Sequence, residues 1–455
     1  MFKAVSKLGS LTSFCLIALA VLVAAGAWTG IVQVGLPAQP PPPGRGAGAT
    51  DQESTASPTA VASPTVTSTL ASQASRRLSM PLLFLPATPT PRPPRPTAWP
   101  KPAVQQLTED ILTVAAGGGF AYLGTRKGLI VVDVQDPTRP RVLNRLDFGW
   151  PKGVEAVDIQ WLGTRVVVLG LDRGWHRDSP LPGSHLMTVD VRDPTAPRLL
   201  QQLPQHEISF TMDRVGNALV LGGMRGGPTC NGADGGLLVY DAGKDDGLTR
   251  IACYPLTGAA PLAVAAEQTE VLLTAISVPD QRNQFVFWFD LTDPSQPLLR
   301  RSERIQADTA LWLIARQQGR SVMGGFSSDL LMIEDASQEP APLHTAAVGS
   351  QRSCGLSGIA KLDGEWFLRM GMGCDMPALI HWSGKLQEPA PRGEIDRIAV
   401  QGQVYLQPTE GQDHAWNSVA AAEGLVFLVD HRYGGILTIV DVGGSGPPRI
   451  VGRLD

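Results

Sequence analysis

Gly128-Leu-Ile-Val-Val-Asp-Val134 is a short β-branched run that ends in Asp, and four other segments of the chain repeat it. These copies are His185-Leu-Met-Thr-Val-Asp-Val191, Gly236-Leu-Leu-Val-Tyr-Asp-Ala242, Phe285-Val-Phe-Trp-Phe-Asp-Leu291 and Gly435-Ile-Leu-Thr-Ile-Val-Asp-Val442. The first four matched Asp residues are 57, 51 and 49 positions apart. Self-similarity at such a period is typical of repeat architectures. The sequence therefore predicts a repeat protein.

Two weaker copies fill the 151 positions between Asp290 and Asp441. They are Ser328-Asp-Leu-Leu-Met-Ile-Glu334, before Glu339-Pro-Ala-Pro342, and Ala378-Leu-Ile-His-Trp382, before Glu388-Pro-Ala-Pro391. Three strong copies instead precede Asp136-Pro-Thr-Arg-Pro140, Asp193-Pro-Thr-Ala-Pro197 and Asp293-Pro-Ser-Gln-Pro297. We interpret the Asp that ends each strong copy as a turn-forming residue, because a chemical site does not repeat itself around a ring.

Each unit is predicted to form four short strands separated by turns that contain Gly or Asp-Pro, and the units show no sustained helical period. Units of this kind suit the blades of a β-propeller. We predict an all-β, seven-bladed propeller over 104–455, with blades at about 111–147, 154–203, 208–255, 261–302, 308–345, 356–396 and 415–455. The ring would close by packing of the last blade on the first, helped by Val104–Leu107.

The phrase Leu-Ile-Val-Val-Asp-Val followed by Asp-Pro-x-x-Pro resembles the LVIVD repeat, which is found in extracellular propellers of bacteria and archaea. The resemblance extends over most of Ile111–Asp455. It is strong in the first, second, fourth and seventh units, partial in the third and degenerate in the fifth and sixth. The family implies a fold but no settled chemistry, so it does not by itself define a function.

Residues 1–36 are predicted to direct export. Lys3 and Lys7 precede an apolar stretch, Leu11–Leu36, which is longer than the ~20 residues that cross a bilayer. Positive charge on its amino side orients the N-terminus toward the cytoplasm. The alternative is a cleavable signal peptide with a cleavage site at Ala25-Gly-Ala27. We favour a membrane anchor because apolar sequence continues beyond that site; either segment places the propeller outside the cytoplasm.

Residues 37–103 are rich in Pro, Ser and Thr, as in Ala87-Thr-Pro-Thr-Pro-Arg-Pro-Pro94. Such sequence cannot bury enough apolar surface to offset the entropy of ordering, so a disordered stalk is predicted. The net charge of the whole chain is −4, which provides no basic field for nucleic acid.

Four cysteines lie outside the apolar N-terminal segment. Cys354 and Cys374 fall at adjacent ends of neighbouring strands in the sixth unit, and Cys230 and Cys253 fall within the third. Export favours oxidation, and four cysteines allow three pairings. We predict disulfides between Cys354 and Cys374 and between Cys230 and Cys253, against the alternative of buried free thiols.

Candidate binding residues lie on one face of the predicted propeller, where the loops between second and third strands meet the connections between blades. Two of these loops are enlarged, at 172–183 and 224–235. Long loops with charged and aromatic residues often carry function on a rigid scaffold. We predict a contact surface made of Trp175, His176, Arg177, Asp234, Trp416, His431, Arg432 and Tyr433. Trp175 and Trp416 have an alternative role as apolar caps on the blades.

No nucleophile elbow, phosphate-binding loop, dinucleotide fingerprint or zinc spacing occurs in the sequence. We therefore expect no cofactor, no metal and no catalytic residue. If a metal is bound, the ligands would be Glu155, His206, Glu207 and His414. The favoured function is an exported binding module that binds a protein or glycan partner. Residues 1–36 would attach it to the membrane. The alternative is an exported hydrolase, lyase or oxidoreductase with a metal or substrate in the central channel.

Overall fold

The computed structural model describes residues 107–455 apart from 152, 173–182, 225–229, 231–232, 245, 279–282, 307–309, 326–329, 336–342, 349–354, 373–376, 388–395, 407–418, 431–434 and 445. No helix in the described part of the chain is long and apolar enough to cross a membrane. The predicted membrane segment and stalk, residues 1–103, lie outside the described residues.

The described residues form an all-β fold of short strands. The first half of the strands are β1 (Ile111–Gly117), β2 (Phe120–Thr125), β3 (Gly128–Asp133), β4 (Arg141–Asp147), β5 (Val154–Trp161), β6 (Arg165–Asp172), β7 (Gly183–Asp190), β8 (Arg198–Gln205), β9 (Ile208–Val215), β10 (Ala218–Met224), β11 (Gly235–Asp241), β12 (Thr249–Leu256), β13 (Ala259–Glu267) and β14 (Glu270–Ser277). The second half are β15 (Asn283–Asp290), β16 (Leu298–Gln306), β17 (Leu313–Gln317), β18 (Arg320–Gly324), β19 (Leu330–Asp335), β20 (Leu343–Ala347), β21 (Gly355–Leu362), β22 (Glu365–Met372), β23 (Ala378–Leu386), β24 (Asp396–Tyr405), β25 (Val419–Ala422), β26 (Leu425–Asp430), β27 (Ile436–Asp441) and β28 (Arg449–Leu454).

Successive strands pair antiparallel in groups of four, as the repeat predicts. We call β1–β4 the first sheet, β5–β8 the second sheet, and so on to β25–β28, the last sheet. The sheets of β17–β20 and β21–β24 are joined at their outer strands, because Ala346 and Ala347 of β20 pair parallel with Asp396 and Arg397 of β24. This join produces an eight-stranded sheet that the sequence did not predict.

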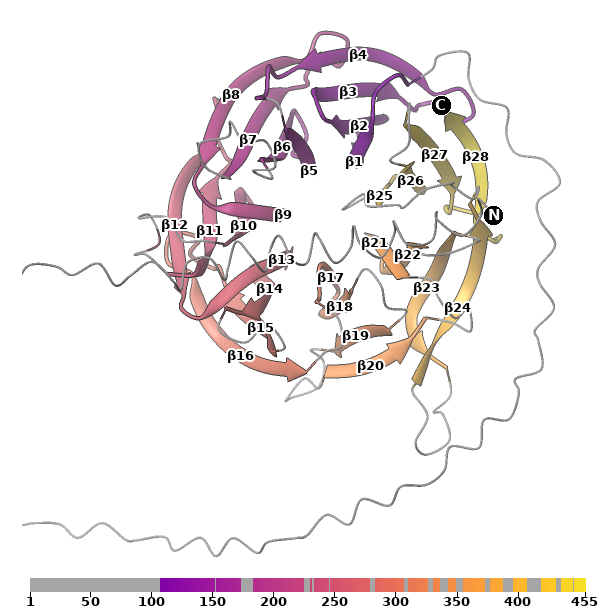
Figure 1. Ribbon diagram of the computed structural model, residues 1–455. Coiled ribbons are helices and arrows are strands. Elements are labelled where there is room, and N and C mark those ends of the chain that lie inside the picture. The colour runs from indigo at the N-terminus through magenta and orange to yellow at the C-terminus, as the bar shows by residue number, and fades with distance from the viewer. Residues whose placement is uncertain are drawn as a thin grey trace, which may run out of the picture. The chain divides into compact units, whose positions relative to one another are not determined.

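The first strands of the sheets surround a common centre, and the fourth strands form the perimeter (Figure 1). Each first strand contacts the first strand of the next sheet, in the order β1, β5, β9, β13, β17, β21 and β25. Contact between β25 and β1 then closes the series. These contacts, with the four-stranded sheets, are those of a β-propeller.

Closure of the ring joins the two ends of the described chain. The backbone N–H of Leu107 donates to the carbonyl oxygen of Asp455. Leu107 is buried in one apolar cluster with Ile111 of the first sheet and Leu437 and Leu454 of the last. The prediction that the last blade packs on the first is confirmed, including the part played by Leu107. Val104 lies outside the described residues.

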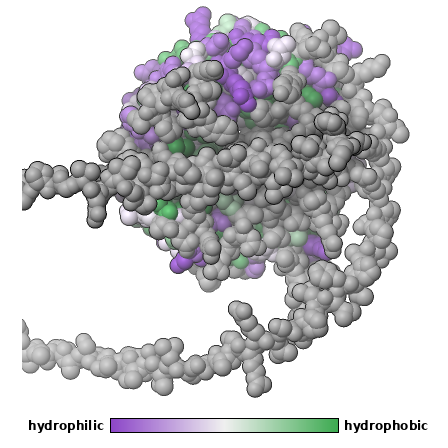
Figure 2. Space-filling view, in the orientation of Figure 1, coloured by the Kyte–Doolittle hydropathy of each residue, from purple (hydrophilic) through white to green (hydrophobic). Residues whose placement is uncertain are grey.

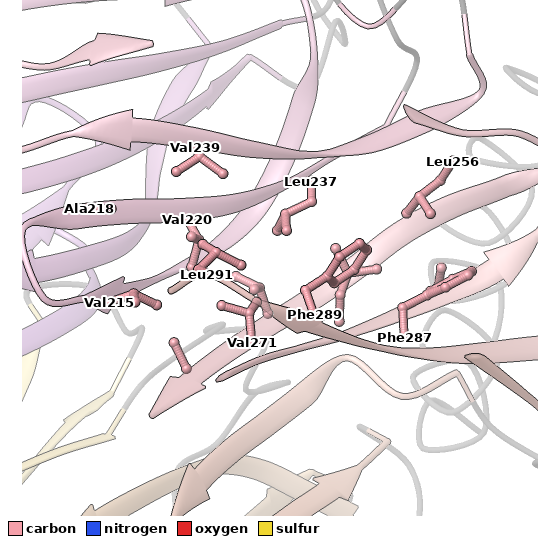
Figure 3. Close-up of a cluster of buried hydrophobic side chains, with 14 of the residues drawn as sticks. Val215, Ala218, Val220, Leu237, Val239, Leu256, Val271, Phe287, Phe289 and Leu291 are labelled. Atoms are coloured by element: carbon pink, nitrogen blue, oxygen red, sulfur yellow. The ribbon is translucent and has the colours of Figure 1, made fainter. Parts of the chain in front are cut away.

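The hydrophobic core lies between neighbouring sheets rather than at the centre of the ring. Figure 3 shows Val220 and Val239 of the third sheet against Val271 and Phe289 of the fourth. The second and third strands of a sheet face a neighbour on both sides, so they read as continuous apolar runs. All eight residues of β6 are buried, for example. Such strands lose their polar–apolar alternation because both faces are covered.

The turns after the third strands show why Asp recurs there. Asp133 Oδ1 accepts a hydrogen bond from the N–H of Gln135 at 3.1 Å. Asp136 Oδ1 then accepts from the N–H and the hydroxyl of Thr138 at 3.0 and 2.6 Å. The second and fourth sheets repeat both contacts with Asp190, Asp193, Asp290 and Asp293. The interpretation of these residues as turn-forming is confirmed.

The fourth residue of several outer strands fixes one sheet to the turn of the next. Asn144 Nδ2 of β4 donates to the carbonyl of Thr195 at 2.7 Å, and Gln201 of β8 bonds both backbone groups of Leu248. In β28 the equivalent residue is Gly452, where a Cβ would lie 1.7 Å from the carbonyl oxygen of Pro137. Only glycine fits this approach, which joins the last sheet to the first.

Candidate functional site

Two faces of the ring differ in what they carry. The loop face holds the connections between second and third strands and between successive sheets; the turn face holds the inner hairpins and the Asp-Pro turns. The enlarged loops leave the loop face from paired strand ends, Asp172 with Gly183 and Met224 with Gly235. Both loops therefore begin and end on ordered backbone.

Of the predicted contact surface, Asp234 alone lies within the described residues. Its side chain is exposed in part, and Oδ2 accepts a hydrogen bond from the N–H of Gly258 at 2.7 Å. Asp234 thus ties the enlarged loop of the third sheet to the connection that enters the fourth. The remaining predicted contact residues fall outside the described ranges: Trp175, His176, Arg177, Trp416, His431, Arg432 and Tyr433.

A cleft lies between the last two sheets at the base of the loop face. It has a volume of about 30 Å³ and is lined by Arg369, Pro377, Leu406, Leu428, Val429, Asp430, Ile436, Thr438 and Arg453. Three of these residues directly adjoin chain segments that the structure does not describe, at 373–376, 407–418 and 431–434. Two of the segments, 407–418 and 431–434, carry predicted contact residues, which themselves lie outside the described residues.

Two guanidinium groups supply the positive charge of this cleft. Arg369 is buried, and its Nη1 donates to the carbonyl of Val429 at 2.5 Å, which joins the sixth sheet to the last. Arg453 Nε donates to Asp455 Oδ1 at 2.5 Å. Arg369 therefore bonds a carbonyl oxygen and Arg453 a carboxylate of the protein itself, and Asp430 adds a negative charge to the lining.

The sequence did not point to Arg369 or Arg453, because both lie inside strands far apart in the chain. Asp430 carried the only local signal, since it precedes His431-Arg432-Tyr433 directly. The pairing of β27 with both β26 and β28 brings Asp430, Thr438 and Arg453 to one place.

Of the residues predicted to hold a metal if one is bound, Glu155 and Glu207 take part in different ion pairs. Glu155 Oε2 lies 3.9 Å from Arg126 Nη2, and Arg126 Nε lies 3.2 Å from Asp110 Oδ2. Glu207 is buried and accepts from Arg250 Nη1 at 2.9 Å, whereas the neighbouring His206 is exposed. Within the described ranges, no three His, Cys, Asp or Glu side chains are grouped to hold a metal. His414 lies outside those ranges.

A disulfide joins Cys230 to Cys253, as predicted, with the two Cα atoms 5.7 Å apart. It attaches the enlarged loop of the third sheet to the outer strand β12. Arg250 Nη2 donates to Cys230 Sγ at 3.3 Å, so the arginine of the Glu207–Arg250 ion pair also contacts the disulfide. The predicted partners Cys354 and Cys374 fall among the residues that the structure does not describe.

Side chains cross the central channel at two levels. Near the loop face, the rings of Phe210 in β9 and Trp312, just before β17, meet edge to face with centroids 5.2 Å apart. Near the turn face, Lys361 Nζ donates to the carbonyls of Arg316 and Ala266 at 2.7 and 3.2 Å, and it lies 3.7 Å from Asp213 Oδ2. One lysine of the sixth sheet thereby contacts three other sheets.

A buried ion pair lies beside this lysine in the fifth sheet. Arg316 Nη1 donates to Glu334 Oε2 at 2.9 Å and to Ser321 Oγ at 2.5 Å, and all three residues are buried. Arg316 Nη2 also bonds Glu270 of the fourth sheet. A buried guanidinium and a buried carboxylate are tolerated when each satisfies the other. These residues serve the packing of neighbouring sheets.

Taken together, four-stranded sheets around a centre, a closed ring of inner strands and recurrent Asp turns define a repeat-containing β-propeller. The family model of the LVIVD repeat matches residues 111–147, the first of the predicted units. The predicted resemblance is therefore confirmed in that unit. No curated protein sequence has significant similarity to this chain.

Solved structures with a similar arrangement come from distant proteins. Sqt1 of Saccharomyces cerevisiae is 9% identical, with a TM-score of 0.47 over 76% of this chain and 85% of that one. Hsv2 of Kluyveromyces lactis is 9% identical, with a TM-score of 0.46 over 76% of this chain and 99% of its own. A protein of unknown function from Desulfotomaculum acetoxidans is 11% identical, with a TM-score of 0.48 over 71% and 95% of the two chains.

Proposed function

We propose that this chain is a seven-bladed, non-catalytic binding propeller that faces the outside of the cell, where its loop face captures a protein or glycan. The count of seven takes the eight-stranded sheet as two blades joined at their outer strands. Residues 1–36 would anchor the chain in the membrane, and residues 37–103 would form the stalk.

The observation that carries this proposal is the concentration of enlarged loops on one face of a ring that is otherwise closely paired. Both enlarged loops rise from ordered strand ends, and the disulfide fixes one of them to β12. The cleft between the last two sheets lies on the same face. A rigid scaffold with variable loops is a common means of binding a macromolecule.

The described lining of the central channel supports binding on the face over chemistry in the channel. Trp312 and Phe210 occupy one level, and Lys361 occupies another. These side chains hold neighbouring sheets together, so a substrate in the channel would have to displace packing contacts.

Defined probes can test the binding role. The full-length chain in detergent micelles is applied to an array of cell-surface glycans, and purified surface proteins are tested by interferometry. The double variant Trp175→Ala/Arg432→Ala should reduce the signal at least about tenfold, because aromatic and Arg side chains dominate binding hot spots. Arg192→Ala, an exposed arginine on the turn face, is the matched control and should bind normally.

Equal binding by the double variant would contradict the choice of surface. A stoichiometric metal in the purified chain, together with turnover of a chromogenic ester or glycoside, would favour an enzyme instead. Export is tested separately. Protease added to intact cells should release a folded fragment that begins near Trp99–Leu107, whereas recovery of the whole chain in the cytosol would contradict the anchor.

A further inference from the structure

The outer edge of the fourth sheet differs from the other outer edges of the ring. β16 is nine residues long, and within the described residues it pairs only with β15. Within the described ranges, the backbone donors and acceptors of its other edge have no partner strand. Open edges of this kind can pair with another extended segment, and most natural proteins protect them.

Most of the other outer strands carry such protection. Pro204 and Pro255 are each the seventh of eight residues in β8 and β12, and proline cannot donate to an added strand, so the free edges of these strands are shorter than that of β16. β28 is short and contains Gly452. β24 already pairs with β20. β4 has neither proline nor glycine, but it is seven residues long, and its Arg141 and Arg145 lie beside Asp133 and Glu109.

The chain itself shows that an outer edge can accept a further strand. Ala346 and Ala347 of β20 pair parallel with Asp396 and Arg397 at the edge of β24. The backbone geometry at the perimeter is thus compatible with strand addition, and β16 offers a longer edge than the short contact made there.

The charge of β16 determines which kind of segment could pair with its free edge. The strand contains Arg300, Arg301 and Arg304 but one acid, Glu303. Leu298, Arg300, Ser302 and Arg304 are the exposed residues of its alternating pattern, and Leu298 is 52% exposed. Arg301 is held over the ring of Trp288, 4.2 Å from its centroid, so the face of the strand is ordered.

A second copy of the same edge is disfavoured by this charge, because pairing β16 with itself would bring arginines together. An extended segment that carries Asp or Glu at alternate positions would instead place carboxylates opposite Arg300 and Arg304. Arg300 already pairs with the carboxylate of Asp290, which shows that it accepts an acidic neighbour.

We propose that the edge of β16 is a docking site for an acidic, extended segment of a partner protein, which adds to the fourth sheet as a fifth strand. This site is separate from the loop face and does not depend on its ligand. Backbone pairing supplies the affinity, and the arginines choose the sign of the partner's charge.

The probe is a fluorescent peptide of about eight residues that alternates Glu with Val or Thr, the length of an ordinary strand. We expect saturable binding to the full-length chain by anisotropy, weakened as salt is raised. Arg300→Glu/Arg304→Glu should weaken binding at least about tenfold, because cross-strand attraction becomes repulsion. Arg141→Glu/Arg145→Glu, the same change on β4, is the matched control and should bind the peptide as the unmodified chain does.

A second peptide separates strand addition from simple charge attraction. Methylation of its backbone nitrogens at alternate residues removes donors and keeps every charge, so binding should be lost. Equal binding of the methylated peptide, equal binding by the β16 variant, or preference for a Lys-containing peptide would overturn the proposal. Concentration-dependent self-association that the β16 variant abolishes would identify a second copy as the occupant and would overturn it too. Arg304→Glu alone serves if the double variant does not fold.

Discussion

The first and fifth sheets fill equivalent positions in their first three strands with different side chains, which are apolar in the first sheet and ionic or polar in the fifth. In the first sheet, Ala116 pairs with Ala121, and Ala121 pairs with Val132. In the fifth, Arg316 pairs with Ser321, and Ser321 pairs with Glu334. We call each set of three paired residues a row. Both rows lie next to the turn face, and Val132 and Glu334 are both buried. The row is apolar in the first sheet and ionic in the fifth.

Strand register corrects how the weak fifth repeat aligns with the strong ones. Asp133 pairs with Phe120, the first residue of β2, and Asp335 pairs with Arg320, the first residue of β18. Asp335 thus takes the backbone position of Asp133, and Glu334 takes that of Val132. Glu334, the last residue of the weak copy, is therefore not the equivalent of Asp133, and an offset of one residue turns a side chain to the opposite face of a strand.

The difference teaches that the repeat specifies strand order and turns more strictly than it specifies the content of the core. A hydrophobic row tolerates changes of size, whereas an ionic row depends on each partner remaining in place. Removal of one partner leaves the other charge buried and uncompensated. The fifth sheet should therefore be the more sensitive of the two to single substitutions.

The largest expected effect follows from breaking the ionic row. Glu334→Gln should lower the free energy of unfolding by about 3 kcal/mol, because the buried Arg316 guanidinium loses its buried carboxylate and keeps only the exposed Glu270 as an ionic partner. Urea unfolding followed by tryptophan fluorescence measures the change. Replacement of the whole row, Arg316→Met/Ser321→Ala/Glu334→Leu, should return stability to within about 2 kcal/mol of the unmodified chain. A triple variant less stable than the single one would contradict the comparison.

A second effect concerns the covalent link of the third sheet, which has neither the ionic row nor a complete Asp-Pro turn. The Cys230–Cys253 disulfide closes a segment with a sequence separation of 23. Cys230→Ala/Cys253→Ala should cost roughly 3 kcal/mol on the loop-entropy account. Reductant should lower the stability of the unmodified chain and leave the double variant unchanged. If reductant affects both equally, another disulfide is responsible.

Acid should weaken the Asp-containing turns of the strong repeats. Hydrogen bonds from the Thr292 hydroxyl and from Arg300 lower the pKa of Asp290 to about 2, and Thr138, Arg192 and Thr195 lower the pKa of Asp136, Asp190 and Asp193. A carboxyl whose pKa is lowered on folding stabilises the fold above its unfolded pKa, and that contribution is lost as pH falls through the folded value. Stability should therefore decline as pH drops below about 4 toward about 2.

Asp290→Asn provides the check, because an amide keeps an acceptor oxygen in the turn but does not titrate. The variant should show a shallower decline than the unmodified chain when urea midpoints are measured between neutral and acidic pH. Identical slopes would show that Asp290 does not contribute to acid unfolding.

The smallest effect is expected at the exposed Arg–Asp pairs of the strong sheets. Arg141 Nη2 lies 2.6 Å from Asp133 Oδ2, but the arginine side chain is 69% exposed. Arg141→Ala should change stability by less than about 1 kcal/mol, because solvent screens such pairs. Arg449→Ala, at the equivalent pair of the last sheet, should behave alike. A cost near that of Glu334→Gln would remove the distinction between exposed and buried pairs.

The sequence was a good guide to the scaffold and a partial one to the candidate site. Asp136, Asp193 and Asp293 were recognisable as turn residues because their hydrogen bonds reach only two residues along the chain. The pairing of Cys230 with Cys253 followed from adjacent strands of one unit. Arg369 and Arg453 gave no signal, since the cleft that they line forms only where two sheets meet.

The sequence by itself determined the strand units, their order and the turns between them, because these depend on local hydrogen bonds and on the alternation of glycine, proline and apolar residues. Tertiary structure alone decided how Lys361 reaches three other sheets and why Glu334 is buried. These contacts join residues far apart in the chain, and no local pattern encodes the distance between them. They exist only once neighbouring sheets have buried their shared faces against each other.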